Sequence, residues 1–325
     1  MAKVKNFKTI FPAVSVPLND DYSINEPEFR AYLRWIKTFY GKGMDGLVCN
    51  GHTGEITGLT RAERKRVVEI CAEECGDVMT IISGVNCENT AESIEMAKEA
   101  KEAGADGILL MPPHMWLRFG MNPDAPFEYV KDVAEGADID IIIHLYPATS
   151  KAFYPVETLI KMCKEIDHVK CIKMGTRVTS IYEHDVRLLR QECPDISLIT
   201  CHDETLCVSW FPGMDGALIG FAGCVPEIIC PAREVFANPD KHTLKEAQDW
   251  SDRIYHISQA IYGGGQPSGE AHARLKEALK QRGIFSSALM RKPVLPLNQE
   301  EKDWVALGLE RSQLPEVDMA QFEDK

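Results

Sequence analysis

The chain has 325 residues, of which 45% are hydrophobic and 26% are charged, and this usage is that of a folded globular protein and excludes a disordered one. Its 36 lysines and arginines against 49 acidic residues give a formal net charge of −13. Without a basic patch to override that charge, we expect neither nucleic acid nor a membrane surface as a partner. The longest apolar runs, such as 138–147, are shorter than the roughly 20 residues that span a bilayer.

The N-terminal segment and the cysteines bear on the compartment. Residues 1–14 contain lysines but no apolar stretch typical of a secretory signal, so we expect a cytoplasmic protein. The 11 cysteines lack framework spacing, which predicts reduced and mostly buried thiols. Cys71 and Cys75 share one face of a predicted helix, but no second pair stands at zinc spacing, so no metal site is predicted.

Short apolar runs alternate with amphipathic stretches over the first 240 residues, which indicates βα units around a parallel sheet. The predicted strands are, in chain order, 10–16, 46–49, 79–83, 107–111, 139–144, 169–173, 197–201 and 216–219. The helices predicted after them are 26–39, 61–74, 90–103, 126–135, 156–165, 179–191, 204–210 and 226–236. Eight such repeats predict an α/β fold, the (β/α)8 TIM barrel. No G-x-G-x-x-G turn follows the first strand to favour a dinucleotide fold.

Local signals support several helix boundaries. Thr60 with Glu63 has capping-box spacing, Asn89 precedes another predicted helix, and Pro155 and Pro226 suit a first helical turn. After residue 240 the pattern changes to helices without strands, over 244–262, 269–282 and 300–310, with a proline-rich turn at 293–296. We therefore predict a catalytic barrel over 1–240 and a C-terminal helical segment over 241–325 packed on it, with glycines 263–265 as a hinge.

The active site of such a barrel lies at the carboxyl ends of its strands, and Lys173 ends the sixth predicted strand. Alternation from Val169 places its side chain inside the barrel or at its rim. Desolvation there disfavours the ammonium form, and a neutral amine is what attack on a carbonyl group requires. Spacing alone leaves open a rim lysine that reaches water through its long stem.

Three motifs carry a resemblance to a known family: Gly51-His52-Thr53-Gly54-Glu55 after the second strand, Tyr146-Pro147 after the fifth, and Cys171-Ile172-Lys173 on the sixth. Together, and in this order, they are similar to the dihydrodipicolinate synthase / N-acetylneuraminate lyase family, over nearly the whole chain. The resemblance implies that Lys173 forms a Schiff base with a 2-oxo acid, usually pyruvate, and that Tyr146 relays protons. It also implies that the loop 51–55, with Thr53 and Gly54, holds the carboxylate of the 2-oxo acid, while Glu55 braces the loop. The covalent imine on Lys173 is then the reactive group, and no metal or other cofactor is expected.

The sequence departs from the family at three places. His52 stands where the synthases have a hydroxyl residue, and His114 lies where they have a tyrosine that reaches a neighbouring subunit. Lys151 takes the place of an arginine that grips the carboxylate of the aldehyde, without that residue's planar fork. The 112–116 segment and a longer loop over 117–122 are similar to the hydratase-aldolase branch, which acts on aryl-aldehyde adducts of pyruvate. Trp116 there either stacks on a flat substrate or packs the loop.

The predicted function is a Schiff-base lyase that makes or breaks a carbon–carbon bond between a 2-oxo acid and an aldehyde, with Leu218 completing the substrate-binding set. A true 4-hydroxy-tetrahydrodipicolinate synthase, a 2-keto-3-deoxy sugar acid aldolase or dehydratase, and an inactive binding protein are the alternatives. A metal-dependent barrel hydrolase is disfavoured because the first strand has no His-x-His. The resemblance implies a homotetramer, a dimer of dimers.

Three further places have two interpretations each. His144 ends an apolar strand, where a histidine is more often a satisfied core residue than a catalyst. The segment 202–204, with sequence His-Asp-Glu, reads either as a rim contact to substrate hydroxyls or as a helix cap. Thr149 and Ser150 are similarly open between the rim of the site and a turn cap.

Overall fold

Eight parallel strands form one sheet in the order β1-β8-β7-β6-β5-β4-β3-β2 in the computed structural model, which describes residues 3–263 and 269–324. Ala13, directly after β1, forms a parallel bridge with Val48 of β2 and so brings the two edges of the sheet together. The strands are β1 (Ile10–Pro12), β2 (Gly46–Cys49), β3 (Thr80–Val85), β4 (Gly107–Leu110), β5 (Asp140–His144), β6 (Val169–Met174), β7 (Ser197–Thr200) and β8 (Gly216–Ile219). The prediction of a (β/α)8 barrel is confirmed.

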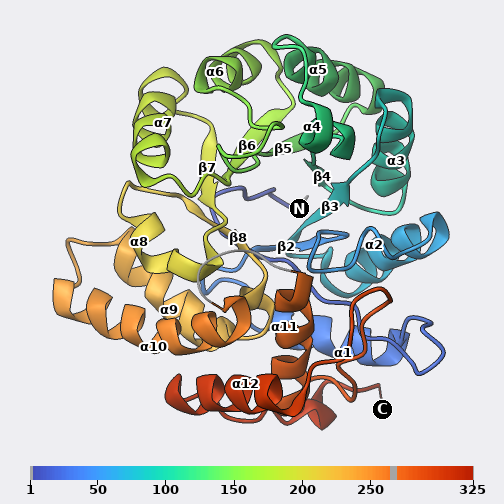
Figure 1. The fold of residues 1–325 in the computed structure, drawn as a ribbon, viewed down its shortest axis with the longest axis vertical. Coiled ribbons are helices and arrows are strands. Elements are labelled where there is room, and N and C mark those ends of the chain that lie inside the picture. Colours follow the sequence, from blue (N-terminus) through green and yellow to red (C-terminus); the bar gives the residue numbers. More distant parts are fainter. Residues whose placement is uncertain (1–2, 264–268, 325) are drawn as a thin grey trace.

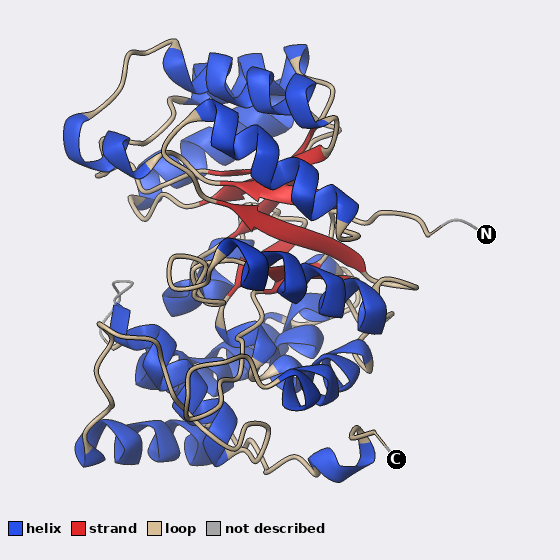
Figure 2. Ribbon diagram, turned by 90° about the vertical axis from the view of Figure 1, so that its right-hand side faces the viewer, coloured by secondary structure: helices blue, strands red, loops and turns tan. Residues whose placement is uncertain are grey.

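Helices ring this sheet, as Figure 1 shows in the view along the barrel. They are α1 (Glu26–Lys37), α2 (Arg61–Cys75), α3 (Thr90–Glu102), α4 (His114–Phe119), α5 (Ala125–Ala137), α6 (Val156–Glu165), α7 (Thr179–Glu192), α8 (Leu206–Trp210) and α9 (Pro226–Ala237). Three more follow the barrel: α10 (Leu244–Tyr262), α11 (Gly269–Gln281) and α12 (Gln299–Arg311). In the side view of Figure 2 these last helices lie together at one side of the strands.

The apolar core has two layers, because neighbouring residues of a strand point to opposite faces of the sheet. The outer layer packs the sheet against the helices and contains most of the buried residues. The inner layer fills the barrel and consists of Phe11, Ala13, Val48, Ile82, Leu109, Met111, Ile142, Cys171, Ile199 and Leu218. This interior is solid apolar packing, and a polar site is therefore confined to its carboxyl end.

Several predicted boundaries agree with the structure. Thr60 and Glu63 form a reciprocal capping box at the start of α2, and Asn89 accepts a hydrogen bond at the start of α3. The first strand is shorter than predicted, because after Pro12 the chain keeps only the single bridge at Ala13. Of the predicted hinge, Gly263 ends α10 with a φ of 53°, and residues 264–265 lie outside the described residues.

Helix α4 corrects the prediction of a loop over 117–122. Its first two backbone N–H groups, those of His114 and Met115, donate to the two carboxylate oxygens of Glu88 at 3.2 and 2.9 Å. The cap therefore comes from a residue 26 positions earlier in the chain. Local sequence patterns contain no sign of such a cap, because N-cap rules look only at the residue next to the helix.

The C-terminal helices are fixed to the barrel by buried polar contacts. Arg282, 1% exposed, forms an ion pair with Glu227 of α9 and donates to the Cys224 carbonyl. Tyr262, the last residue of α10, donates from its hydroxyl to Asp203 Oδ1 at 2.7 Å. This segment thus reaches the carboxyl end of the barrel, where the site lies.

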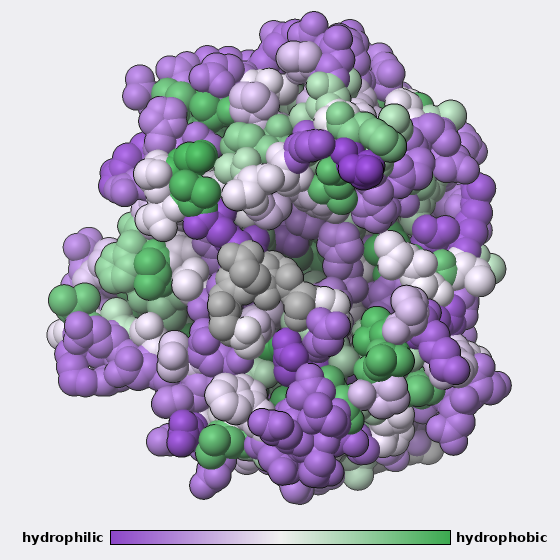
Figure 3. Space-filling model, viewed as in Figure 1, coloured by the Kyte–Doolittle hydropathy of each residue, from purple (hydrophilic) through white to green (hydrophobic). Residues whose placement is uncertain are grey.

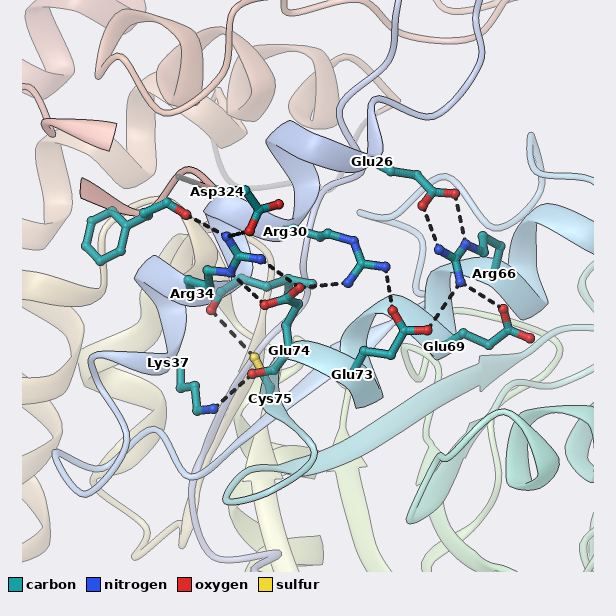
Figure 4. Close-up of polar contacts among 12 residues, drawn as sticks. Glu26, Arg30, Arg34, Lys37, Arg66, Glu69, Glu73, Glu74, Cys75 and Asp324 are labelled. Atoms are coloured by element: carbon teal, nitrogen blue, oxygen red, sulfur yellow. Dashed lines mark hydrogen bonds and ion pairs between the residues drawn. The ribbon is translucent and has the colours of Figure 1, made fainter. Parts of the chain in front are cut away.

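On the outer wall, α1 and α2 are joined by a network of ion pairs (Figure 4). Arg30 and Arg34 of α1 both bind Glu74 of α2, and Arg34 also pairs with Asp324 near the C-terminus. Arg66 of α2 reaches back to Glu26 at 2.7 Å. The described helices include none that is long and apolar enough to cross a membrane.

Candidate active site

A cavity of about 410 Å³ opens at the carboxyl ends of the strands. Among the residues selected from the sequence it is lined by Lys173, Tyr146, His52, Thr53, His114 and Leu218. Lining side chains from outside that set include His144, Arg177, Asp203, Tyr262 and His272. A larger surface hollow of about 650 Å³ runs along α10 and α12, and no predicted residue is among its described lining.

Lys173 stands directly above the filled interior of the barrel. Two residues earlier on β6, Cys171 belongs to the inner apolar layer, and alternation points Lys173 the same way. No described residue forms a hydrogen bond or an ion pair with its ammonium group. Burial lowers the pKa of Lys173 more strongly than Cys201 and Asp203 raise it. The neutral amine that a nucleophile needs is therefore favoured here.

Tyr146 and His52 face each other across this cavity. The hydroxyl of Tyr146 lies 3.4 Å from Nε2 of His52. Burial lowers the pKa of His52 to about 3, with Lys173 acting in the same direction, and burial raises the pKa of the Tyr146 phenol. At neutral pH both groups are uncharged, so the phenol can donate a proton and the imidazole can accept one.

The loop that carries His52 and Thr53 is held in an unusual conformation. Asn50 and Glu55 at its two ends have φ values of 52° and 55°, a region that residues other than glycine rarely adopt. Glu55 fixes one end, because it forms an ion pair with the buried Lys276 of α11 and accepts the Arg291 N–H at 2.9 Å. At the other end a Cβ on Gly84 of β3 would lie 1.9 Å from the Asn50 carbonyl oxygen, so only glycine allows this approach.

Asp203 connects the barrel to α10 at the wall of the cavity. Its Oδ1 accepts hydrogen bonds from the Gly220 N–H at 2.7 Å, the Phe221 N–H at 3.3 Å and the Tyr262 hydroxyl at 2.7 Å. Burial raises the pKa of Asp203 to about 6, against the lowering effect of Tyr262. The segment 202–204 thus contributes a cavity carboxyl group as well as the start of a short helical turn.

Arg177 is the cavity's only described arginine, and its charge is already matched. Its Nε and Nη2 bind the buried carboxylate of Glu204, while Nη1 and Nη2 also donate to the carbonyls of Gly175 and Cys201. A planar guanidinium held through so many of its donors has little left for a ligand.

Three predicted residues do not line the cavity. Lys151 is exposed and donates to the Arg118 carbonyl at 3.2 Å, because the loop after β5 turns its side chain outward. Trp116 is 9% exposed and packs edge-on against Tyr129 and Tyr154, which makes it an anchor for α4 and not a platform for substrate. Gly54 is absent from the described lining, and a Cβ at this position would lie 3.0 Å from the Val14 carbonyl oxygen.

His144, which the sequence left open between a core residue and a catalyst, points into the cavity, and the alternation of its strand predicts that direction. Ile142 lies in the inner apolar layer, so alternation along β5 points His144 inward as well. Its Nδ1 is buried and has no hydrogen-bond partner among the described residues, which corrects the interpretation of a satisfied core histidine. Arg177, Tyr262 and His272 carried no such signal, because they reach the site through loops and through the C-terminal helices.

His202, two residues beyond β7, faces a different space. It lines a second cavity of about 430 Å³ between α7 and α8, and its ring lies 4.7 Å from that of Tyr182. Ser150, left open above, caps a turn by accepting the Ala152 N–H at 3.0 Å. Over residues 3–263 and 269–324, no three histidine, cysteine or acidic side chains come together as metal ligands.

Comparison with known proteins identifies the family. The model of the dihydrodipicolinate synthetase family matches residues 6–311. The chain belongs to this family. It is 26% identical to a 4-hydroxy-tetrahydrodipicolinate synthase of Bartonella bacilliformis over 309 residues, which are 94% of this chain and 98% of that one. The sequence-based prediction of a class I aldolase-type lyase is confirmed at this level.

Solved structures support the fold. The chain superimposes with a TM-score of 0.84 on a crystal structure of YagE, an E. coli prophage protein of the same family in complex with pyruvate, at 21% identity, covering 95% of this chain and 99% of that one. Dihydrodipicolinate synthase from Aquifex aeolicus matches with a TM-score of 0.82 at 19% identity, covering 95% and 99%.

Proposed function

We propose that this protein is a Schiff-base lyase that joins or separates a 2-oxo acid, such as pyruvate, and an aldehyde through an imine on Lys173. The observation that supports it most is the Lys173 amine, which points into the cavity without an acidic partner and has a pKa lowered by burial. Thr53 and the backbone N–H groups of its loop lie at the same mouth as donors for the 2-oxo acid's carboxylate.

In the proposed reaction, the neutral amine of Lys173 attacks the C2 carbonyl carbon, and a C–N bond forms as the C–O π bond breaks. Tyr146 donates its proton to the oxygen, with His52 as its hydrogen-bond partner. Loss of water leaves an iminium ion. The Tyr146 phenolate left by that transfer takes the proton of the C4 hydroxyl, and cleavage of the C3–C4 bond gives an aldehyde and a neutral enamine instead of a free carbanion. The imine with Lys173 itself supplies the electron sink, and the proposal needs no separate cofactor.

We infer further that the aldehyde carries no carboxylate. Of the described lining residues, the lysine and arginine side chains are Lys173, which is the nucleophile, and Arg177, which is neutralised by Glu204. Asp203 adds negative charge to the same wall. Leucines at positions 109, 117 and 218 supply apolar surface instead.

Reductive trapping tests the imine. Wild-type protein incubated with pyruvate and borohydride should gain the mass of one reduced pyruvate adduct, and Lys173→Ala should gain none. The absence of an adduct on the wild type, or an equal adduct on Lys173→Ala, would contradict the proposal.

A panel of aldehydes tests the second substrate. With pyruvate as the partner, uncharged aryl aldehydes should give a kcat/KM at least about tenfold above that of aspartate semialdehyde, since a missing partner for a buried charge costs more than 1.4 kcal/mol. Efficient condensation with aspartate semialdehyde would instead favour the activity for which the Bartonella relative is named.

We also propose a homotetramer built as a dimer of dimers. Val208 within α8 and Phe211 directly after it are 61% and 64% exposed, and Figure 3 shows apolar surface in this part of the molecule. Large exposed apolar side chains that gather in one place mark an interface. Native mass spectrometry should show four chains, and a shift to dimers in Phe211→Lys would assign this patch to one of the two interfaces.

A further inference from the structure

His144 and Lys173 are neighbours across two strands. They form a register pair between β5 and β6, and both line the cavity at the upper end of the apolar interior. Residues paired in this way on one face of a sheet have side chains in contact range. The ring of His144 is fixed from the other side by Tyr146, edge-on at a centroid distance of 4.9 Å. It therefore stands between the nucleophile and the proton-relay tyrosine.

One nitrogen of this ring is left without a partner. The residue is 7% exposed, and its Nδ1 is buried with no hydrogen bond to any described residue. A buried nitrogen without a hydrogen bond is unusual, because buried polar groups are almost always paired. The charged and titratable groups around it are Lys173, His52, Arg177 and the Tyr146 phenol, and none of them is a carboxylate that would pair with an imidazolium. Burial and these neighbours hold the pKa of His144 well below its usual range.

We propose that His144 is a second acid–base group of this site, serving the nitrogen of Lys173 while Tyr146 serves the carbonyl oxygen. The inference rests on the proposed function and adds a residue to it. Imine formation moves two protons at two different atoms. The register pairing of His144 with Lys173 and its ring contact with Tyr146 supply one group near each of these atoms.

Attack of the amine gives a tetrahedral adduct with N⁺H₂ and O⁻. His144 accepts one proton from the nitrogen, and Tyr146 gives its own to the oxygen. The nitrogen lone pair then forms the C=N bond as the C–O bond breaks, and the hydroxyl leaves as water with the proton returned by His144. The products are the iminium ion, water, neutral His144 and the Tyr146 phenolate, which regains a proton by taking one from C3 to form the enamine.

The test measures how fast the imine forms. Wild type and His144→Gln are mixed with saturating pyruvate, quenched with borohydride at a series of times, and weighed intact. Glutamine keeps a polar side chain of similar size, but its amide neither takes up nor releases a proton near neutral pH. We expect the rate of adduct formation to fall about 10²- to 10³-fold, with the same final adduct and a half-saturating pyruvate concentration within threefold of wild type.

His202→Gln is the matched control. His202 also follows a strand, is 5% exposed, has a buried unpartnered Nε2 and packs on a tyrosine ring, but it lies outside the Lys173 cavity. Its adduct should form within threefold of the wild-type rate. An equal loss in both variants would show a merely structural effect and overturn the proposal. A slower reaction of His144→Gln that higher pyruvate restores would also overturn it, since His144 would then be a carboxylate ligand.

Two additions keep the outcomes separate. If His144→Gln does not fold, as judged by its circular dichroism, His144→Asn takes its place. In the variant His144→Ala, added imidazole should restore the rate of adduct formation in proportion to its concentration. A rate that does not respond to imidazole would count against a proton-transfer role. A wild type that forms no adduct at any time would reject the Schiff-base function itself.

Discussion

The wall between α1 and α2 and the mouth of the barrel both crowd ionisable side chains together, and they treat charge in opposite ways. On the wall each arginine meets a carboxylate. Although partial burial raises the pKa of Glu74, Arg34 and Arg30 bring it below its usual range. At the mouth, Lys173 and His52 have no acidic partner among the described residues, and burial pushes both toward their neutral forms.

This difference separates two uses of charged residues. Matched charges on the wall join two helices and the C-terminal end of the chain without any group being left reactive. Unmatched groups at the mouth cost stability, and the fold keeps them where a substrate would complete their contacts. A group's lack of a partner is therefore a better guide to chemistry here than its burial alone.

Replacing Lys173 should separate stability from activity most sharply. In Lys173→Met we expect turnover to fall by roughly 10⁴-fold or more, because no other lysine is among the described residues that line the cavity. The free energy of unfolding should rise by about 1 kcal/mol, and the urea midpoint with it, because a desolvated amine without a partner is removed. Assays of aldehyde formation and urea titrations measure the two effects, and a variant that is both inactive and less stable would contradict the comparison.

The fold could be predicted from the sequence because it follows from short periodic patterns, whereas the choice of Lys173 as the nucleophile also needed the resemblance to a known family. Strand alternation placed Lys173 inward, and the same rule applied to Ile142 would have placed His144 beside it. The frequency of histidines at strand ends instead favoured a satisfied core residue, whereas Nδ1 of His144 is buried without a hydrogen-bond partner among the described residues. The period of a strand is a geometric constraint, whereas the frequency is only an average over many proteins.

Other parts of the site depend on contacts that no local pattern contains. Helix α4 is capped by Glu88 from the loop between β3 and α3, and Tyr262 enters through a helix far along the chain. Lys151 has the sequence position of the family's arginine, but the direction in which a loop side chain points is set by its surroundings. A matching position in the sequence therefore does not show that a side chain lines the cavity.

The Glu55–Lys276 pair combines the two regions, since it is a matched pair buried beneath the mouth. In Lys276→Met the carboxylate of Glu55 would be buried without its partner, and we expect the protein to lose about 3–5 kcal/mol of stability. Adding Glu55→Gln should recover part of that loss, because no buried charge is then left over. Urea titrations of the single and double variants provide the measurement, and equal losses in both would argue against an uncompensated charge as the cause.

His52 should make the stability of the mouth depend on pH. The unfolded chain binds a proton at His52 near pH 6.5, while the folded protein does so only near pH 3. Between these values the unfolded state holds more protons, so acidification destabilises the fold, by about 1 kcal/mol from this residue at pH 5.5. His52→Gln should lose less stability than wild type between pH 7.5 and 5.5. Urea titrations at the two pH values measure the difference, and an equal loss in both proteins would argue against His52 as its source.

The smallest effect is expected on the wall, at Arg66. Its side chain is 36% exposed and pairs with Glu26, Glu69 and Glu73, which are exposed to similar extents. Water and salt screen such pairs, so Arg66→Gln should cost about 0.5–1 kcal/mol at low ionic strength, and activity should not change. In 0.5 M NaCl the two urea midpoints should converge. A loss that persists in salt would mean that the arginine stabilises the wall through the packing of its stem, because salt screens the charge and leaves apolar contacts in place.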